Sequence, residues 1–143
     1  MSTQAPTLQG KCVLIVEDND LVAKFFRMAL ERAGGCSCVI SEDVPTILGH
    51  VASGEIDLVL LDVSLNNSEW EGRSINGVEL CRMLKNKSPR RLPVLLATAH
   101  AMSGDRERLL ETSGADGYLE KPVYDSAILI QKVRSLIENT QAE

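Results

Sequence analysis

Several features that would place a chain in a common functional class are missing from this sequence. No hydrophobic run reaches the roughly 18 apolar residues that a membrane-spanning helix requires. The polar segment from Met1 to Gly10 lacks the basic start and the apolar stretch of a secretory signal peptide. We therefore expect a protein with no membrane segment that functions in the cytoplasm.

The sequence also lacks the cysteine and histidine spacing of a metal site. Paired Cys-x-x-Cys motifs are absent, and the two histidines, His50 and His100, are isolated. The motif Cys36-x-Cys38 falls in an expected short strand, where both side chains would point to the same face. Buried thiols usually behave as small hydrophobic side chains. We therefore expect reduced core residues at Cys12, Cys36, Cys38 and Cys81.

An excess of basic residues is missing as well. The formal net charge is −5, whereas a nucleic-acid surface needs a clustered basic face. One basic cluster exists, but a solvated helix end and loop explain it more simply; it contains Lys85, Lys87, Arg90 and Arg91. We therefore expect no direct contact with nucleic acid.

What the sequence does contain is a set of short hydrophobic runs, each followed by a chemically specific residue. With 143 residues and 44% hydrophobic content, the chain can form one domain with its own core. Continuous apolar runs of this length are typical of parallel strands that helices cover on both faces. The runs are Val13–Val16 before Glu17 and Asp18, Leu58–Leu61 before Asp62, Pro93–Ala97 before Thr98, and Gly117–Glu120 before Lys121.

Strands and helices are predicted to alternate along the chain. Strands are expected over 11–16, 36–40, 57–62, 93–98 and 117–120, and helices over 21–33, 44–52, 77–86, 104–112 and 125–137. Asp20 and Asp43 are the expected N-caps of the first two helices, and Gly34-Gly35 ends the first. This order predicts an α/β fold with a five-stranded parallel sheet. We expect the folded domain over 11–139, after a flexible leader over 1–10 with no core-building pattern and before a tail over 140–143.

The carboxyl ends of the predicted strands should meet at one edge of the sheet, where α/β proteins bind ligands. Three acids, a hydroxyl and an ammonium would gather there: Glu17, Asp18, Asp62, Thr98 and Lys121. Such a set can hold a divalent cation, present a carboxylate nucleophile and bind a phosphoryl group.

These separated motifs, in this order, make the chain resemble the receiver domains of response regulators, the phosphorylated components of two-component signalling. The resemblance covers roughly Lys11 to Ile137. It implies a doubly wound, flavodoxin-like sheet of strand order 2-1-3-4-5, of which CheY is a known example. The stretch Thr98–Asp105 further resembles single-domain regulators of the DivK type.

The resemblance implies a role for each acid. Asp62 matches the phosphoacceptor, whose carboxylate forms an aspartyl-phosphate. Glu17 and Asp18 match the acidic pair that binds Mg²⁺, and the backbone carbonyl of Ser64 matches a further metal ligand. Asp is more usual at the position of Glu17, so Glu17 is expected to act through a water molecule. The cation would also relieve the repulsion among the crowded carboxylates.

The resemblance implies further roles at the last two strands. Thr98 matches the hydroxyl that hydrogen-bonds the phosphoryl group, and Lys121 matches the ammonium that pairs with another phosphoryl oxygen. A cis peptide is implied between Lys121 and Pro122. Tyr118 matches a switch aromatic that follows Thr98 inward on phosphorylation and remodels the surface around the fourth and fifth helices. A half-buried tyrosine that closes the sheet edge is the alternative.

The segment from Val63 to Asn76 departs from the family, because it is longer than usual and lacks the customary proline. It contains the only tryptophan, Trp70. Long loops in compact domains are often functional. Trp70 is therefore expected to contact a partner or lie over the active site; alternatively, its ring is tucked against the domain. His100 and Ser64 occupy positions where the family varies the side chains that control water access to the phosphorylated aspartate.

We expect a phosphoacceptor that assists its own phosphorylation and dephosphorylation rather than a turnover enzyme. A sensor histidine kinase or a histidine phosphotransfer protein would donate the phosphoryl group to Asp62. The signal would pass to a protein partner through the face of helix 104–112, strand 117–120 and the last helix. The extent of the chain favours a complete single-domain protein over a receiver excised from a longer regulator.

Three other functions are weighed against this expectation. A pseudo-receiver would bind proteins without phosphorylation, but the intact set of site residues argues against it. An Asp-dependent phosphatase usually has a second acid where this chain has Ser64. A flavin-binding module would need a phosphate-binding loop rich in Gly, Ser and Thr after the first strand, which is absent.

Overall fold

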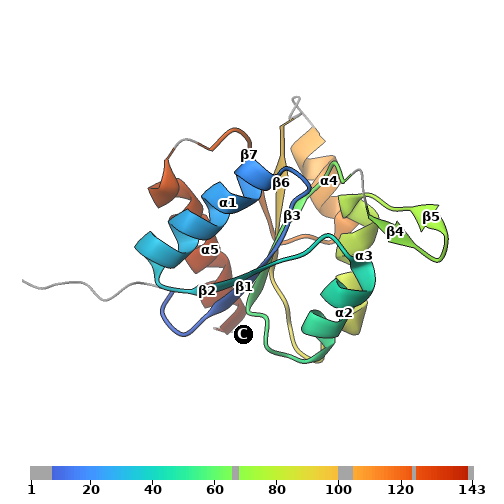
Figure 1. Ribbon diagram of the computed structural model, residues 1–143, viewed down its shortest axis with the longest axis horizontal. Coiled ribbons are helices and arrows are strands. Elements are labelled where there is room, and N and C mark those ends of the chain that lie inside the picture. The colour runs from blue at the N-terminus through green and yellow to red at the C-terminus, as the bar shows by residue number, and fades with distance from the viewer. Residues whose placement is uncertain (1–7, 66–67, 100–104, 124, 142–143) are drawn as a thin grey trace, which may run out of the picture.

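A computed structural model of the chain describes residues 8–65, 68–99, 105–123 and 125–141 (Figure 1). Five strands form a parallel sheet in the order β2-β1-β3-β6-β7. Their bounds are β1 Cys12–Val16, β2 Ser37–Ile40, β3 Leu58–Asp62, β6 Val94–Thr98 and β7 Gly117–Glu120. The α/β class and the flavodoxin-like strand order are confirmed, with β6 and β7 as the fourth and fifth strands of the sheet.

Helices cover both faces of this sheet (Figure 1). One face carries α1 Asp20–Met28, the π-helical turn η1 Ala29–Gly34 and α5 Ser126–Gln141; the other carries α2 Val44–Ala52, α3 Gly77–Lys87 and α4 Asp105–Ser113. Because neither face of the sheet meets water, its strands need no polar alternation. Within the described residues, none of the helices has both the length and the apolar character needed to cross a membrane.

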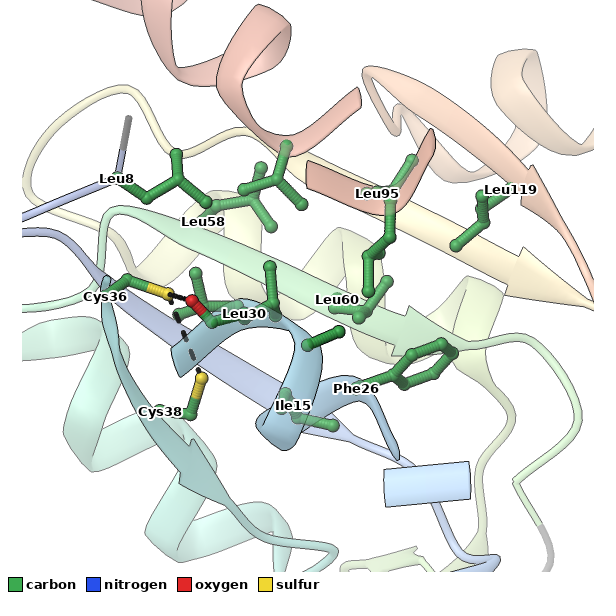
Figure 2. Close-up of a cluster of buried hydrophobic side chains, with 14 of the residues drawn as sticks. Leu8, Ile15, Phe26, Leu30, Cys36, Cys38, Leu58, Leu60, Leu95 and Leu119 are labelled. Atoms are coloured by element: carbon green, nitrogen blue, oxygen red, sulfur yellow. Dashed lines mark hydrogen bonds between the residues drawn. The ribbon is translucent and has the colours of Figure 1, made fainter. Parts of the chain in front are cut away.

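Successive residues of the central strands enter two different cores. In β1, Val13 and Ile15 share a buried cluster with side chains of α1 and α5, and part of this cluster is drawn in Figure 2. Leu14 and Val16 instead join a cluster with side chains of α2 and α3. All four side chains are fully buried. The two-residue period of a strand thus divides one apolar run between two cores.

The predicted N-cap of α1 is wrong by one residue. Asn19, not Asp20, caps the helix, since its Oδ1 accepts hydrogen bonds from the N–H groups of Leu21 (3.0 Å) and Val22 (3.1 Å). Asn and Asp are both strong caps, so residue type did not distinguish the neighbours. The prediction at Asp43 is confirmed, because its carboxylate accepts a hydrogen bond from the first turn of α2.

The first helical segment ends as predicted at its two glycines. The helix of α1 continues through η1, and Gly35 follows in the left-handed conformation with φ of 78°. Glycine adopts this conformation without the steric cost that a Cβ brings.

The segment expected as a long polar loop contains a small hairpin. Its strands are β4 Glu69–Trp70 and β5 Arg73–Ser74, paired antiparallel. The turn between them uses positive φ at Glu71 (52°) and Gly72 (81°). At the base of the hairpin, the Ile75 N–H donates to the Ser68 carbonyl at 3.1 Å. Strands of two residues leave too short a pattern to be predicted from sequence.

Trp70 is half-buried and packs against the core cluster on the α2 and α3 side of the sheet. The hairpin is tied to the residue before the α2 cap, because the Ser68 hydroxyl donates to the Glu42 carbonyl at 2.9 Å. This packing supports the alternative in which the ring is tucked against the domain. Contact of Trp70 with a partner stays a prediction.

Leu8 lies in the core, although it belongs to the segment expected as a flexible leader with no core-building pattern. This side chain is only 1% exposed and belongs to the core cluster beneath α1 and α5. Its N–H donates to the Gly34 carbonyl at 2.8 Å. A Cβ added at Gly34 would lie 2.9 Å from Leu8 Cδ1, so the glycine makes room for this packing. A single leucine in a polar segment shows no periodicity, which is why the sequence did not reveal it.

The expectation of core cysteines is confirmed for three of the four, since Cys36, Cys38 and Cys81 are buried. All four thiols are free. Cys12 is partly buried.

Candidate functional site

The strand register brings the predicted site residues to one edge of the sheet. Val16 pairs with Leu61, so Glu17 and Asp62 follow at the ends of the adjacent strands β1 and β3. Asp62 in turn pairs with Ala97, one residue before Thr98 at the end of β6. β1 and β3 are neighbours at the centre of the sheet, where the direction of winding reverses and α/β proteins bind ligands.

The acids form a close cluster at this edge. Glu17, Asp18 and Asp62 each offer a carboxylate oxygen, and these oxygens lie within 4.8 Å of one another. Glu17 and Asp62 are buried, whereas Asp18 is partly exposed. A cluster of carboxylate oxygens at this spacing suits a hard divalent cation such as Mg²⁺. The structure therefore brings together the three side chains that were predicted as metal ligands.

Lys121 places a positive charge beside two of these acids. Its Nζ lies 2.8 Å from Glu17 Oε1 and 3.5 Å from Asp62 Oδ1, with the lysine side chain 13% exposed. The Lys121 N–H donates to the Thr98 carbonyl at 2.8 Å, which fixes the segment after β7 against the end of β6. The peptide bond between Lys121 and Pro122 is cis, as the resemblance implied.

Glu17 has protein partners at both carboxylate oxygens. Oε1 accepts the hydrogen bond from Lys121, and Oε2 accepts one from the Asn19 N–H at 3.1 Å. Burial raises the pKa of Glu17 to about 7, against the lowering effect of these hydrogen bonds; the charge of Asp62 adds to the rise. A carboxylate held in this way fits contact with a cation through water, which stays a prediction.

The backbone around Asp62 is held by two hydrogen bonds and by the close approach of Gly77. Asp62 Oδ1 accepts a hydrogen bond from the Ser64 N–H at 3.1 Å. At the start of α3, a Cβ added to Gly77 would lie 2.2 Å from the Asp62 carbonyl oxygen, and the Gly77 N–H donates to the Val63 carbonyl at 2.9 Å. Gly77 is thus a site-shaping residue that sequence reasoning missed. The only sequence signal was a glycine at the first position of a helix.

Thr98 and Tyr118 are both buried. Tyr118 lies on β7, one of the two edge strands of the sheet, and lines a groove with Leu110 of α4 and with Ile128 and Lys132 of α5. This places Tyr118 on the face that was predicted to contact a downstream partner. Its role as a switch, and that of the Ser64 carbonyl as a metal ligand, stay predictions. His100 lies outside the described residues.

A cavity of about 510 Å³ opens at the acid cluster. Glu17, Asp18, Asp62 and Lys121 line its polar part. Its apolar part comes from α1 and the segment after Lys121: Leu21, Val22, Phe25, Phe26, Pro122 and Val123. Leu21 is 78% exposed. The acids are therefore open to a ligand on the side next to α1.

Comparison with known proteins agrees with the family resemblance found in the sequence. Residues 13–134 match the response regulator receiver domain family. The polar-differentiation response regulator DivK of Brucella anthropi is 34% identical over 114 residues, which cover 79% of this chain and 85% of that protein. DivK of Brucella ovis shows the same identity and coverage. The narrower resemblance to DivK-type regulators is confirmed as a similarity.

Solved structures share the fold. A CheY-like response regulator receiver domain protein from Methanospirillum hungatei JF-1 has a TM-score of 0.75 at 22% identity, covering 92% of this chain and 97% of its own. A sensor protein from Polaromonas sp. JS666 has a TM-score of 0.74 at 26% identity, covering 92% of this chain and 98% of its own. With the site geometry, the sequence match over 13–134 and the DivK relatives in agreement, the chain belongs to the response regulator receiver domain family.

Proposed function

We propose that this receiver accepts a phosphoryl group on Asp62 from a phosphohistidine, with Mg²⁺, and signals through protein contacts that depend on phosphorylation. The observation that carries the proposal is the acid cluster beside Lys121. Three carboxylates and one ammonium leave a formal charge of −2, which a divalent cation would balance. Buried charges are costly for a fold, and carboxyl groups with strongly shifted pKa values, such as that of Glu17, cluster at functional sites.

In the proposed reaction, an Asp62 carboxylate oxygen attacks phosphorus, the P–N bond to the donor imidazole breaks, and the imidazole nitrogen keeps the electron pair. Lys121 Nζ, 3.5 Å from Asp62 Oδ1, is within reach of a phosphoryl oxygen attached there. The Thr98 hydroxyl, at the end of the neighbouring strand, would donate to another phosphoryl oxygen. Mg²⁺ bound to the acids would neutralise their charge and stabilise the negative charge of the phosphoryl oxygens.

The donor would dock on α1. Leu21, Val22 and Phe25 line the apolar side of the cavity that contains Asp62. A helix that carries the phosphohistidine could bury its own apolar residues against this side while the histidine reaches the acids. This geometry suits a sensor histidine kinase or a histidine phosphotransfer protein, whose donor histidine lies on a helix.

A downstream protein would bind at the groove between α4, β7 and α5 and so receive the signal. Thr98 ends β6 and Tyr118 lies on the adjacent strand β7, where it lines that groove. A phosphoryl group that draws the Thr98 hydroxyl toward Asp62 would free space for the Tyr118 ring. A protein partner that binds only one position of the ring would then sense phosphorylation.

The test uses phosphoramidate, a small donor with the P–N bond of a phosphohistidine. The protein is incubated with phosphoramidate and Mg²⁺, and its intact mass is measured. We expect wild type and the control Asp20→Asn, an exposed acid beside the site, to gain one phosphoryl group. Asp62→Asn, or wild type with a chelator, should gain none. No gain in wild type would favour the pseudo-receiver that binds proteins without phosphorylation.

A further inference from the structure

Two thiols lie together at the edge of the core beneath α1. Cys36 precedes β2 and Cys38 lies within it, and their Sγ atoms are 4.0 Å apart (Figure 2). Cys36 is 5% exposed and Cys38 9%. Both side chains leave the same side of the strand and enter the cluster that contains Leu30 and Phe26. The phosphoacceptor site uses neither thiol.

The two thiols differ in how easily they lose a proton, because their surroundings differ. The Cys36 thiol donates a hydrogen bond to the Leu30 carbonyl of η1 at 3.4 Å. The hydrogen bond from the Cys38 thiol lowers the pKa of Cys36, while the same contact and burial raise the pKa of Cys38. Cys36 is therefore the more easily ionised sulfur, and a thiolate is the form that reacts with oxidants.

We propose that Cys36 and Cys38 form an oxidative modification site, at which a peroxide converts the two thiols into an intrachain disulfide. The Cys36 sulfur attacks one peroxide oxygen, the O–O bond breaks, and one water leaves with the Cys36 proton. The Cys38 sulfur then attacks the resulting sulfenic acid, the S–O bond breaks, and a second water carries away the Cys38 proton. Overall, two thiols and one hydrogen peroxide give one disulfide and two waters.

Formation of the disulfide requires the backbone to move at Cys36 rather than at Cys38. Residues two apart in a strand have Cα atoms about 6.6–6.8 Å apart, at the upper limit of about 6.8 Å for a disulfide. The sulfurs must approach by about 2 Å to reach the S–S bond length of about 2.05 Å. Cys36 lies outside the strand and directly follows Gly35, whose φ of 78° ends η1. The approach therefore comes from the Cys36 side, with loss of its hydrogen bond to Leu30.

The apolar surroundings favour a disulfide over a metal-bound dithiolate. In the described part of the chain, the one group of three or more metal-ligating side chains is the acid cluster at the phosphoacceptor site. Two thiolates around a monovalent ion would leave a net negative charge in the apolar core, which is costly. A disulfide is neutral and weakly polar. A strained disulfide is also easily reduced, so the modification is expected to be reversible by thiols.

The test uses the full chain with hydrogen peroxide. Reduced protein is freed of reductant, treated with peroxide, unfolded in N-ethylmaleimide and digested with trypsin. Arg32 and Arg73 are the nearest cleavage sites on either side, so Cys36 and Cys38 share a peptide with no other cysteine. We expect this peptide to lose the mass of two hydrogens and take up no maleimide. Treatment with a thiol before labelling should restore two maleimides.

Single substitutions provide the controls. Cys36→Ser and Cys38→Ser should each abolish the two-hydrogen loss, whereas Cys81→Ser, a buried thiol of α3, should leave it unchanged. Two maleimides on the peptide after peroxide would overturn the proposal. Equal oxidation of Cys12 and Cys81 would also overturn it, because general unfolding rather than the paired geometry would then explain the reaction.

Discussion

The ammonium of Lys121 lies 2.8 Å from Glu17 Oε1 and joins the end of β7 to the end of β1, across 104 positions of the sequence. The same ammonium is 3.5 Å from Asp62 Oδ1. Without a bound metal ion, this ammonium neutralises part of the negative charge of the acid cluster. It also lies where a phosphoryl oxygen on Asp62 would need a positive charge.

Lys121→Met is predicted to separate metal binding from phosphorylation. Loss of the ammonium leaves the acids less neutralised, so Mg²⁺ affinity measured by calorimetry should rise. Phosphorylation should slow by about 10²-fold, the usual loss when one charge-stabilising donor is removed. Lys24→Met, an exposed lysine of α1, is the control and should change neither value. If Lys121→Met weakened Mg²⁺ binding and phosphorylation equally, Lys121 would only hold the fold together.

Stability without metal is predicted to fall as the pH rises across the titration of Glu17. Burial raises its pKa to about 7 from an ordinary value of 4.5. Between pH 4.5 and about pH 7, the folded chain therefore binds more protons than the unfolded chain. The free energy of unfolding decreases with rising pH in this range. Urea unfolding in the presence of a chelator measures this slope. Glu17→Gln, which does not titrate, should flatten it; an identical slope in both proteins would contradict the assignment.

Gly77→Ala is predicted to damage the site through the backbone. The added Cβ would lie 2.2 Å from the Asp62 carbonyl oxygen, so the start of α3 or the end of β3 must move. Overpacking of this kind costs about 1–3 kcal/mol of unfolding free energy, and phosphorylation of Asp62 should slow as well. Gly49→Ala in α2 is the matched control, since its Cβ meets nothing within 4 Å. That variant should be as stable as wild type or slightly more stable.

Asn19→Ala is predicted to cost about 1 kcal/mol of unfolding free energy, because the N-cap of α1 is lost. Asp20→Ala should cost less, since Asp20 is the first helical residue and not the cap. Thermal or urea unfolding of the two variants compares them directly. A larger loss of unfolding free energy in Asp20→Ala than in Asn19→Ala would show that Asp20 is the N-cap, as expected from the sequence.

The sequence predicted the sheet and most of the site because both follow from local patterns. Apolar runs marked the strands, and the residues that follow them, such as Asp62 and Thr98, had to meet at one edge. The contributions of Gly77 and Leu8 depend on contacts with distant segments, which no local pattern encodes. The hairpin around Trp70 was missed for a different reason, since each of its strands has only two residues.

The most direct test of the proposed phosphorylation of Asp62 is to locate the phosphoryl group. Protein phosphorylated in the presence of Mg²⁺ is treated with borohydride, which reduces an aspartyl-phosphate to homoserine, and its peptides are sequenced by mass spectrometry. We expect homoserine at position 62, and only in samples that received both donor and Mg²⁺. Phosphorylated protein with unchanged aspartate at position 62, or with homoserine at position 18 instead, would contradict it.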